Sequence, residues 1–364
     1  MSYKSKKIFI FEFFPFHAHN LCLHPHLMKM IFADTEFELR YFLNPTLFKE
    51  NTYIPKKHSA TCIASTKTMH VLRKLKLLKI WLIIKFYFYV KISRPDIIIF
   101  NSLENGISLE LFRLLAKTHK IALVHNPENI ALEKDKYSIQ LSMNKYIYEH
   151  FRSKLDGYCL SFYGTETKPN RIKKNDTFTI GVPGSISFSR RNYELLVDIA
   201  KKLSLSTHKH HKVIFNIIGG INEKDGPKLQ SLINKLDIRE YFIFHAKVSD
   251  EEFIQAIYES DALIPLITEK NSPYFSIKNS ATYSHSARYT KPMIIPRENA
   301  DAWHIPYDCC ITYEKCDDLV EKLLTIKDDI PNITANYQTL IEKMLWENQN
   351  HLLNVVKSKK FASH

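Results

Sequence analysis

Glycine is scarce in this 364-residue chain, which contains only eight. That scarcity excludes a collagen-like or glycine-rich low-complexity protein. Long apolar runs are also missing. A membrane-spanning helix needs roughly 18 to 20 apolar residues. The segment that comes nearest to this, 80–90, is shorter and is interrupted by Lys85. The polar start and the short apolar stretch after it do not match a signal peptide. We therefore expect a folded, non-secreted protein without a membrane-spanning helix.

The cysteines lack any metal-binding or redox spacing. None of the six forms a CxxC pair, and with no secretion signal they are interpreted as reduced thiols of a cytoplasmic protein. The remaining composition, 45% hydrophobic and 24% charged residues, is typical of a globular chain. A chain of this length is long enough for two domains.

Acidic residues are absent from one long segment. Residues 51–95 contain ten Lys or Arg and no Asp or Glu. Residues 1–165 have 24 basic and 13 acidic residues, whereas 166–364 have 27 and 25. The excess positive charge of the first half indicates an anionic neighbour.

Strand-like and helix-like segments alternate along both halves, which predicts parallel α/β sheets. In the first half we expect strands at 8–14, 37–43, 96–101, 121–125 and 157–162, and helices at 20–32, 69–92, 107–117 and 139–155. In the second half we expect strands at 178–182, 212–218, 241–244, 262–267 and 293–296, and helices at 192–203, 227–236, 249–260, 277–289 and 336–356.

The polar segment 164–176 has no apolar periodicity and is predicted to link two domains. The expected organisation is an acceptor-binding Rossmann-like domain at 1–163, a donor-binding Rossmann-like domain at 177–331, and a C-terminal segment, 332–364, that packs back on the first domain. Two doubly wound domains place their ligands at the carboxyl ends of the strands, in a cleft. This arrangement favours a two-substrate enzyme.

An ordered set of motifs lies in the second half. Gly184-Ser185 follows a strand, Arg190-Arg191-Asn192 precedes a helix with Leu195-Leu196, and Gly219-Gly220 ends the next strand. The series continues with the stretch FIFHAKVS, Ser260-Asp261-Ala262 before a strand, and Lys291-Pro292-Met293-Ile294. The set, over about 178–296, resembles the nucleotide-sugar-binding domain of GT-B glycosyltransferases, especially family 4. The resemblance implies two Rossmann-like domains and transfer of a hexose from a UDP- or GDP-sugar without a metal or other cofactor.

The donor site that this resemblance implies is rich in phosphate-binding groups. Glycine permits close backbone approach, a helix start offers N–H donors, and arginine meets phosphate with a forked geometry. The candidate donor residues are Gly184, Ser185, Arg190, Arg191, Gly219, His245, Val248, Lys278, Ser280, Ala281 and Thr282. For the two arginines, solvent exposure at a helix start is an equally good interpretation. Packing explains His245 at least as well as contact with the base, and Lys278 is compatible with an ordinary surface position.

The chain departs from family 4 at one point. That family has a Glu-x7-Glu pair whose second member lies seven residues before a characteristic proline. Counted back from Pro292, the two positions are occupied by His285 and Ile277, neither of them acidic. The retaining stereochemistry of the family is therefore not implied.

Four residues of the first half are candidate catalytic groups. His125 and Glu128 follow a predicted buried strand at its carboxyl end, and His17 and His19 lie in the loop after the first strand. Imidazole and carboxylate groups can accept the proton of an attacking hydroxyl. The alternative, that His125 and Glu128 are ordinary polar residues of a surface loop, is an equally good interpretation. Together with His24 and His26 the first-loop histidines also invite a zinc interpretation, but nothing completes a ligand set, so we expect no metal.

Segment 69–92 combines apolar, basic and aromatic residues, which is typical of a helix on an anionic membrane surface. A buried domain helix with a charged outer edge is the alternative, and nucleic acid is not expected as a partner.

The function that we expect is glycosyl transfer to a lipid-linked or polysaccharide acceptor at the cytoplasmic face of a membrane. The alternatives are a nucleotide-sugar epimerase of the same fold and a non-catalytic membrane- or glycan-binding scaffold.

Overall fold

The computed structural model describes most of the chain. The described residues are 5–13, 23–31, 36–50, 58–74, 77–103, 106–129, 135–162, 177–206, 211–222, 225–245, 248–267, 274 and 277–359. They form two compact units, one from 1–164 and 345–364 and the other from 165–344. The predicted linker, 164–176, lies outside the described residues.

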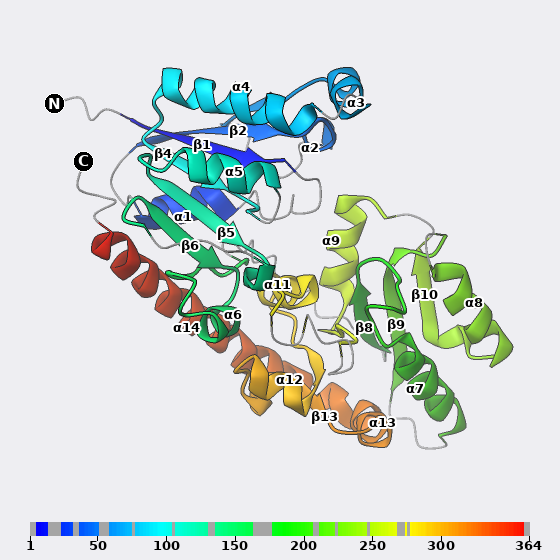
Figure 1. The fold of residues 1–364 in the computed structure, drawn as a ribbon. Coiled ribbons are helices and arrows are strands. Elements are labelled where there is room, and N and C mark those ends of the chain that lie inside the picture. Colours follow the sequence, from blue (N-terminus) through cyan, green and yellow to red (C-terminus); the bar gives the residue numbers. More distant parts are fainter. Residues whose placement is uncertain are drawn as a thin grey trace. The chain divides into compact units, whose positions relative to one another are not determined.

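The first unit contains a seven-stranded parallel sheet with the order β3-β2-β1-β4-β5-β6-β7 (Figure 1). Its strands are β1 (Lys6–Glu12), β2 (Phe37–Leu43), β3 (Ser59–Cys62), β4 (Ile97–Phe100), β5 (Lys120–Val124), β6 (Ser138–Ser142) and β7 (Gly157–Tyr158). Its helices are α1 (Leu23–Ile31), α2 (Pro45–Glu50), α3 (Thr66–Lys74), α4 (Leu78–Ser93), α5 (Gly106–Leu114) and α6 (Lys145–His150). Helices α4 and α5 cover one face of the sheet and α1 covers the other.

The core of this unit explains why its central strands read as continuous apolar runs. All four residues of β4 are buried, as a strand covered on both faces requires. On the α4 side, Phe11 contacts Phe86 of α4 with the ring centroids 5.1 Å apart. Phe42 of the neighbouring strand packs against the same ring at 5.7 Å. Aromatic side chains from two strands and one helix therefore set the position of α4 on the sheet.

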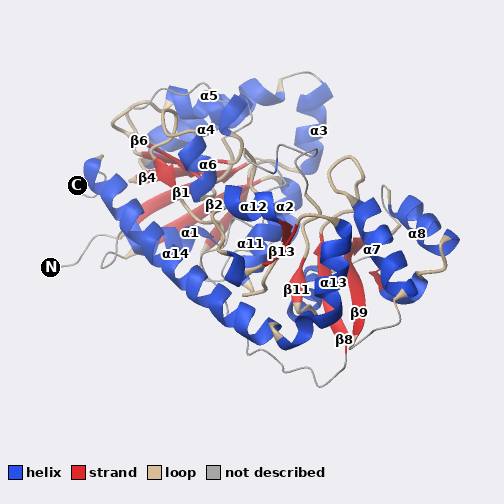
Figure 2. Ribbon diagram, turned by 90° about the horizontal axis from the view of Figure 1, so that it is seen from below, coloured by secondary structure: helices blue, strands red, loops and turns tan. Residues whose placement is uncertain are grey.

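The second unit repeats this design. Its strands are β8 (Thr177–Pro183), β9 (Lys212–Gly220), β10 (Phe242–His245), β11 (Ala262–Leu263), β12 (Ile294–Pro296) and β13 (Ile311–Tyr313). Its helices are α7 (Tyr193–Leu205), α8 (Gly226–Lys235), α9 (Asp250–Glu259), α11 (Ala281–Arg288), α12 (Arg297–Ala302), α13 (Cys316–Thr325) and the first half of α14 (Ile330–Ser358). Figure 2 shows helices on both sides of the red strands. Ile217 and Ile218 of β9 accordingly belong to separate hydrophobic cores on opposite faces of the sheet.

Both sheets share one strand order. Strands β10-β9-β8-β11 are hydrogen-bonded in that order, a bridge joins Leu263 to Met293, and β12 pairs with β13. In sequence terms the first sheet runs 3-2-1-4-5-6-7, and the strands of the second unit follow the order 3-2-1-4-5-6 through the bridge, which is the order of a dinucleotide-binding α/β fold. The predicted fold class, two Rossmann-like doubly wound domains, is confirmed. The strand order reverses between β1 and β4 in one unit and between β8 and β11 in the other, so ligands are expected at those carboxyl ends.

Helix α9 begins with a capping box. The Ser249 side chain accepts a hydrogen bond from the backbone N–H of Glu252, and the Glu252 carboxylate accepts one from the backbone N–H of Ser249. Two backbone donors that the first helical turn leaves without partners are thereby satisfied.

The helix predicted at 139–155 is wrong. Residues 138–142 form β6 at a position buried on both faces, and only 145–150 are helical. Asn144 separates the two elements with an extended backbone, φ −154° and ψ 157°. The apolar residues Ile139, Leu141 and Met143 follow a period of two, and this strand pattern was masked by the helical spacing of the residues after it.

The single helix predicted at 69–92 is also wrong, because α3 and α4 are separate helices. Between them the backbone N–H of Leu77 donates to the carbonyl of Leu72 at 2.9 Å, five residues back instead of four. None of the α3 side chains whose burial is described is buried, whereas α4 packs on the sheet.

Two predictions for the second unit are also corrected. The strand predicted at 262–267 contains only two residues, Ala262–Leu263, and the helix predicted at 277–289 begins at Ala281.

The second half of α14 is fastened to the first unit by Asn348, a fully buried side chain. Its Oδ1 accepts a hydrogen bond from the backbone N–H of Leu160 at 3.1 Å, and its Nδ2 donates to the carbonyl of Tyr158 at 2.7 Å. One amide side chain therefore satisfies two backbone groups beyond the edge strand of the sheet.

Replacing Asn348 with Ala should lower the free energy of unfolding by about 2 to 4 kcal/mol, because two buried backbone groups lose their partner. Denaturant titration followed by circular dichroism measures the change. The matched control is Gln349→Ala at the next, exposed position of the helix. A similar small loss in both variants would show that Asn348 does not hold the helix in place.

Candidate functional site

The switch point of the second unit is built around two glycines. Gly184, directly after β8, has φ +104°, which favours glycine. A side chain there would meet the Arg191 guanidinium, whose Nη2 lies 2.7 Å from the position of a Cβ atom. At Gly219 a Cβ would overlap the Gly184 carbonyl oxygen. The ends of β8 and β9 approach each other as closely as they do because neither residue has a side chain.

Arg191 lies over this turn and is held there. Its Nη1 donates to the carbonyl of Pro183 at 2.5 Å, and the buried Tyr193 hydroxyl lies beside it. Phe188 earlier in the loop is fixed by the carboxylate of Asp225, which accepts its backbone N–H at 2.8 Å. The fork of a guanidinium is thus fixed at a sheet edge where an anion can be bound. Arg190, in contrast, is exposed and shows no side-chain contact among the described residues.

A second backbone contact ties the same loop to the next strand of the sheet. The Asn192 backbone N–H donates to the carbonyl of Leu266 beyond β11 at 2.9 Å, and its side chain caps α7 by accepting from the backbone N–H of Leu195. The two strands that flank the reversal of strand order are therefore joined by the loop that contains Arg191.

The start of α11 is the third part of this region. Ser280 is its buried N-cap residue but makes no side-chain capping bond. Thr282 is almost fully buried, and its Oγ1 has no hydrogen-bond partner among the described residues. Ala281 is exposed, and Lys278 lies just before the helix with Nζ 6.0 Å from the centre of the Tyr274 ring. The backbone N–H groups of the first turn of α11 and the cation of Lys278 lie at the positive end of the helix dipole, which suits an anion.

His285 links α11 electrostatically to Arg191. Burial, together with the positive charges of Arg288 and Arg191, lowers the pKa of His285 to about 3. The imidazole is therefore neutral at physiological pH.

His245 lies at the end of β10. Its Nε2 lies 2.8 Å from Oδ1 of Asn216, and its carbonyl accepts the backbone N–H of Ile221. Val248 lies half-buried in the loop that follows. Ser185 is exposed next to Gly184. These residues share the carboxyl edge of the sheet with Arg191.

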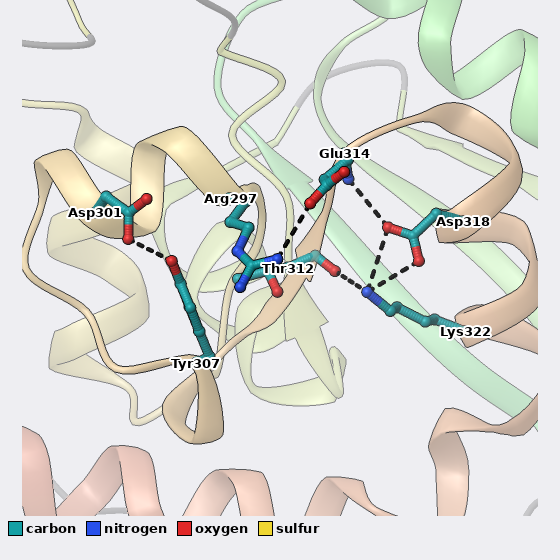
Figure 3. Close-up of polar contacts among 7 residues, drawn as sticks. All are labelled: Arg297, Asp301, Tyr307, Thr312, Glu314, Asp318 and Lys322. Carbon is teal, nitrogen blue, oxygen red and sulfur yellow. Dashed lines mark hydrogen bonds and ion pairs between the residues drawn. The ribbon is translucent and has the colours of Figure 1, made fainter.

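A cavity of about 420 Å³ lies elsewhere, beside β13 and the start of α13. Figure 3 shows that its charges satisfy one another. Arg297 pairs with Glu314 at 3.1 Å, and Lys322 lies 3.0 Å from the Asp318 carboxylate and donates to the carbonyl of Thr312. A ligand would have to break these pairs, so this cavity is not the candidate site.

The switch point of the first unit holds a buried polar cluster. Glu12 ends β1 and Asn101 follows β4, and both are fully buried. The Asn101 Nδ2 donates to the Glu12 carboxylate at 2.6 Å, and its Oδ1 lies 2.8 Å from Nε2 of His24. His125, after β5, has its Nε2 2.9 Å from the Asn101 carbonyl oxygen. Carboxylate, amide and two imidazoles therefore share one sheet edge.

The geometry of the cluster fixes the histidine tautomers. A carbonyl oxygen only accepts, so Nε2 of each ring carries the proton and the neutral ring has its lone pair on Nδ1. Burial lowers the pKa of both His24 and His125 to about 4, although their bonds to Asn101 act in the opposite direction. Both rings are neutral at pH 7.

The sequence interpretation missed Glu12 and Asn101. Asn101 ends the apolar run 97–100, whereas Glu12 interrupts the run 8–14, so a lone charge within an apolar strand was the available signal. Glu128 is exposed in a short turn after His125, and its backbone N–H donates to the Asn126 side chain. His17 and His19 lie outside the described residues.

Known structures match this chain over nearly its whole length. A glycosyltransferase from Rickettsia africae ESF-5 is 14% identical with a TM-score of 0.65, covering 99% of both chains. Anabaena HepE, solved in complex with UDP, is 13% identical with a TM-score of 0.61 over 99% of this chain and 100% of that one. The chain has the GT-B fold.

The GT-B fold also includes enzymes of another reaction class. A UDP-N-acetylglucosamine 2-epimerase is 8% identical with a TM-score of 0.53 over 91% of both chains. No protein-family profile matches the sequence, and no curated protein matches it. At these identities the likeness shows the fold alone, so the chemistry must be argued from the residues.

The two neutral histidines of the first unit predict acid sensitivity. The unfolded chain binds protons below about pH 6.5, whereas native His24 and His125 do so only near pH 4. Stability is therefore retained above pH 6.5 and lost as the pH falls towards 4, by about 1 to 2 kcal/mol for each ring at pH 5.

Denaturant titrations between pH 7.5 and 4.5 measure this slope. His125→Asn should flatten it even if absolute stability falls, whereas His70→Gln at an exposed position of α3 should leave it unchanged. An unchanged slope in His125→Asn would contradict a buried neutral imidazole.

Proposed function

We propose that the chain transfers a hexose from a nucleoside-diphosphate sugar, UDP- or GDP-linked, to a glycan or lipid-linked acceptor. The observation that supports this most is Arg191, fixed over Gly184 at the switch point of a Rossmann-like sheet and close enough to α11 to affect His285. The GT-B fold and the UDP complex of HepE agree with a nucleotide donor.

In this proposal the second unit binds the donor. The diphosphate contacts the Arg191 guanidinium, the backbone near Gly184 and Ser185, and the start of α11 at Ser280, Ala281 and Thr282. Lys278 and Arg190 add positive charge, Gly219 keeps the edge open, and His245 and Val248 border the base. When the bond between the sugar and the diphosphate breaks, these cations and N–H donors stabilise the negative charge on the leaving oxygen. The proposal requires no metal or other cofactor.

The first unit binds the acceptor. His125 donates its Nε2 proton to the Asn101 carbonyl. Nδ1 of the neutral ring is therefore the atom that accepts a hydrogen bond from the attacking hydroxyl. A pKa near 4 makes it a weak base, so its role is to orient the hydroxyl while Glu128, His17 or His19 takes the proton. Glu12 positions Asn101 and, through it, His125. The oxygen then attacks the anomeric carbon as the diphosphate departs.

A nucleotide-sugar epimerase is the second candidate, because one structural neighbour has that activity in its name. The two reactions are distinguished by the need for an acceptor. An epimerase converts the sugar of the donor when no second substrate is present, and a transferase does not. A non-catalytic scaffold would bind nucleotide weakly and show neither reaction.

We place the protein in the cytoplasm at the inner face of the membrane, where a lipid-linked acceptor is presented.

The donor is tested by thermal shift with UDP- and GDP-sugars followed by calorimetry, since a specific ligand raises the unfolding temperature. Arg191→Ala should weaken nucleoside-diphosphate binding about tenfold, because a charge-assisted hydrogen bond contributes about 1.5 to 3 kcal/mol. The control is Arg297→Ala, which removes a guanidinium from the self-paired cavity. Equal affinity of Arg191→Ala and the native protein would exclude the proposed donor site.

His125→Ala separates orientation of the acceptor from binding of the donor. We expect kcat to fall about 10- to 100-fold, while the donor affinity measured by calorimetry stays within twofold of the native value, about 0.4 kcal/mol. Gln338→Ala, at an exposed position of α14, is the control. Unchanged turnover in His125→Ala would remove this histidine from the reaction.

A further inference from the structure

Helix α4 is apolar on two sides. Leu82, Phe86 and Val90 recur every four residues on the side that faces the sheet, and all three are buried. The opposite side has a second series with almost the same spacing, which we name the α4 ridge. The ridge consists of Leu77 (48% exposed), Ile80 (56%), Ile84 (52%), Phe88 (58%) and Ile92 (80%). Residues three or four apart lie on one side of a helix, so the five form a continuous stripe.

The stripe is distinct from ordinary surface apolarity. Other large exposed hydrophobic residues of the described chain, such as Leu114, Leu205 and Trp346, occur singly on different helices. Isolated residues of this kind are normal on a protein surface, whereas a contiguous apolar patch marks an interaction site. None of the helices in the described residues is long and apolar enough to cross a membrane.

The charges around the ridge indicate what it contacts. Residues 51–95 contain ten basic residues and no acidic one. Lys91 is exposed within the ridge, with Nζ 5.4 Å from the centre of the Tyr87 ring, and Lys85 lies along its edge, with Nζ 4.7 Å from that of Trp81. Arg73 and Lys74 are exposed on α3. The acidic Glu110 of α5 lies 3.9 Å from Lys79 and is shared with Arg113 of its own helix, also at 3.9 Å.

We propose that the α4 ridge lies in the headgroup–acyl boundary of an anionic lipid bilayer, with the helix parallel to the membrane. A 16-residue helix presents a straight edge of about 24 Å. Apolar residues enter the bilayer, Trp81 and Tyr87 lie at the interface, and the Lys91 chain reaches back to lipid phosphates, whereas Lys85 donates to the carbonyl of Ile63 at 2.7 Å. A second copy of the chain fits less well, because pairing two ridges brings like charges together.

This inference deepens the lipid-linked acceptor of the proposed function by naming the membrane contact. Vesicle binding needs no nucleotide sugar, and transfer to a water-soluble acceptor needs no vesicle. Each of the two proposals can therefore fail while the other stands.

The test is flotation of the full chain with vesicles of phosphatidylcholine alone and of phosphatidylcholine mixed with phosphatidylglycerol. Native protein should bind the mixed vesicles and not the neutral ones. The triple variant Ile80→Gln, Ile84→Gln, Phe88→Gln should lose binding by at least about tenfold, because three apolar side chains no longer leave water. The control, Leu205→Gln with Ile243→Gln, removes exposed hydrophobic residues from the second unit and should bind like the native protein.

A second variant, Lys74→Gln with Lys91→Gln, tests the charge contribution and should weaken binding to the mixed vesicles severalfold. Equal circular dichroism spectra and unfolding temperatures verify that every variant is folded. Undiminished vesicle binding by the folded triple variant would overturn the proposal. So would a lipid-free dimer, seen by sedimentation, that the triple variant dissociates, since the ridge would then be a contact between copies of this chain.

Discussion

The close approach of β8 and β9 at Gly184 and Gly219 is the constraint on which the rest of the candidate site depends. Because neither residue has a side chain, the two strand ends pack backbone to backbone, and the space above them is filled by the Arg191 guanidinium. The carbonyl of Pro183 holds that guanidinium, and Asn192 joins the same loop to the strand beyond. A fixed cation at a reversal of strand order results from local sterics, before any ligand is considered.

The two units use their equivalent edges differently. In the second unit the edge gathers a guanidinium, a lysine and the start of α11, which suits a diphosphate. In the first unit the equivalent edge gathers Glu12, Asn101, His24 and His125, a cluster held neutral at its imidazoles by burial. One edge therefore concentrates positive charge, whereas the other concentrates a buried carboxylate and neutral imidazoles. The α4 ridge, on a different side of the first unit's sheet, adds a surface for lipid.

Most elements could be predicted from the sequence because apolar runs and helical spacing reflect burial directly, as in β2 and β4. The prediction failed at β6, because the helical spacing of the residues after it masked its period of two and because the polarity of Ser138, Gln140 and Ser142 does not indicate that they are buried. Glycine spacing identified Gly184 and Gly219, but the Glu12–Asn101 pair joins residues 89 apart and depends on strand order. The apolar ridge was likewise inaccessible, because only packing shows which side of a two-sided apolar helix faces the sheet.

The most direct measurement of the central claim is a crystal structure of the protein with a bound nucleoside diphosphate. Phosphate oxygens should lie within hydrogen-bonding distance of Arg191 and of the backbone at the start of α11, next to Gly184. A diphosphate seated instead in the cavity of Arg297 and Lys322, with the Arg191 loop empty, would contradict it.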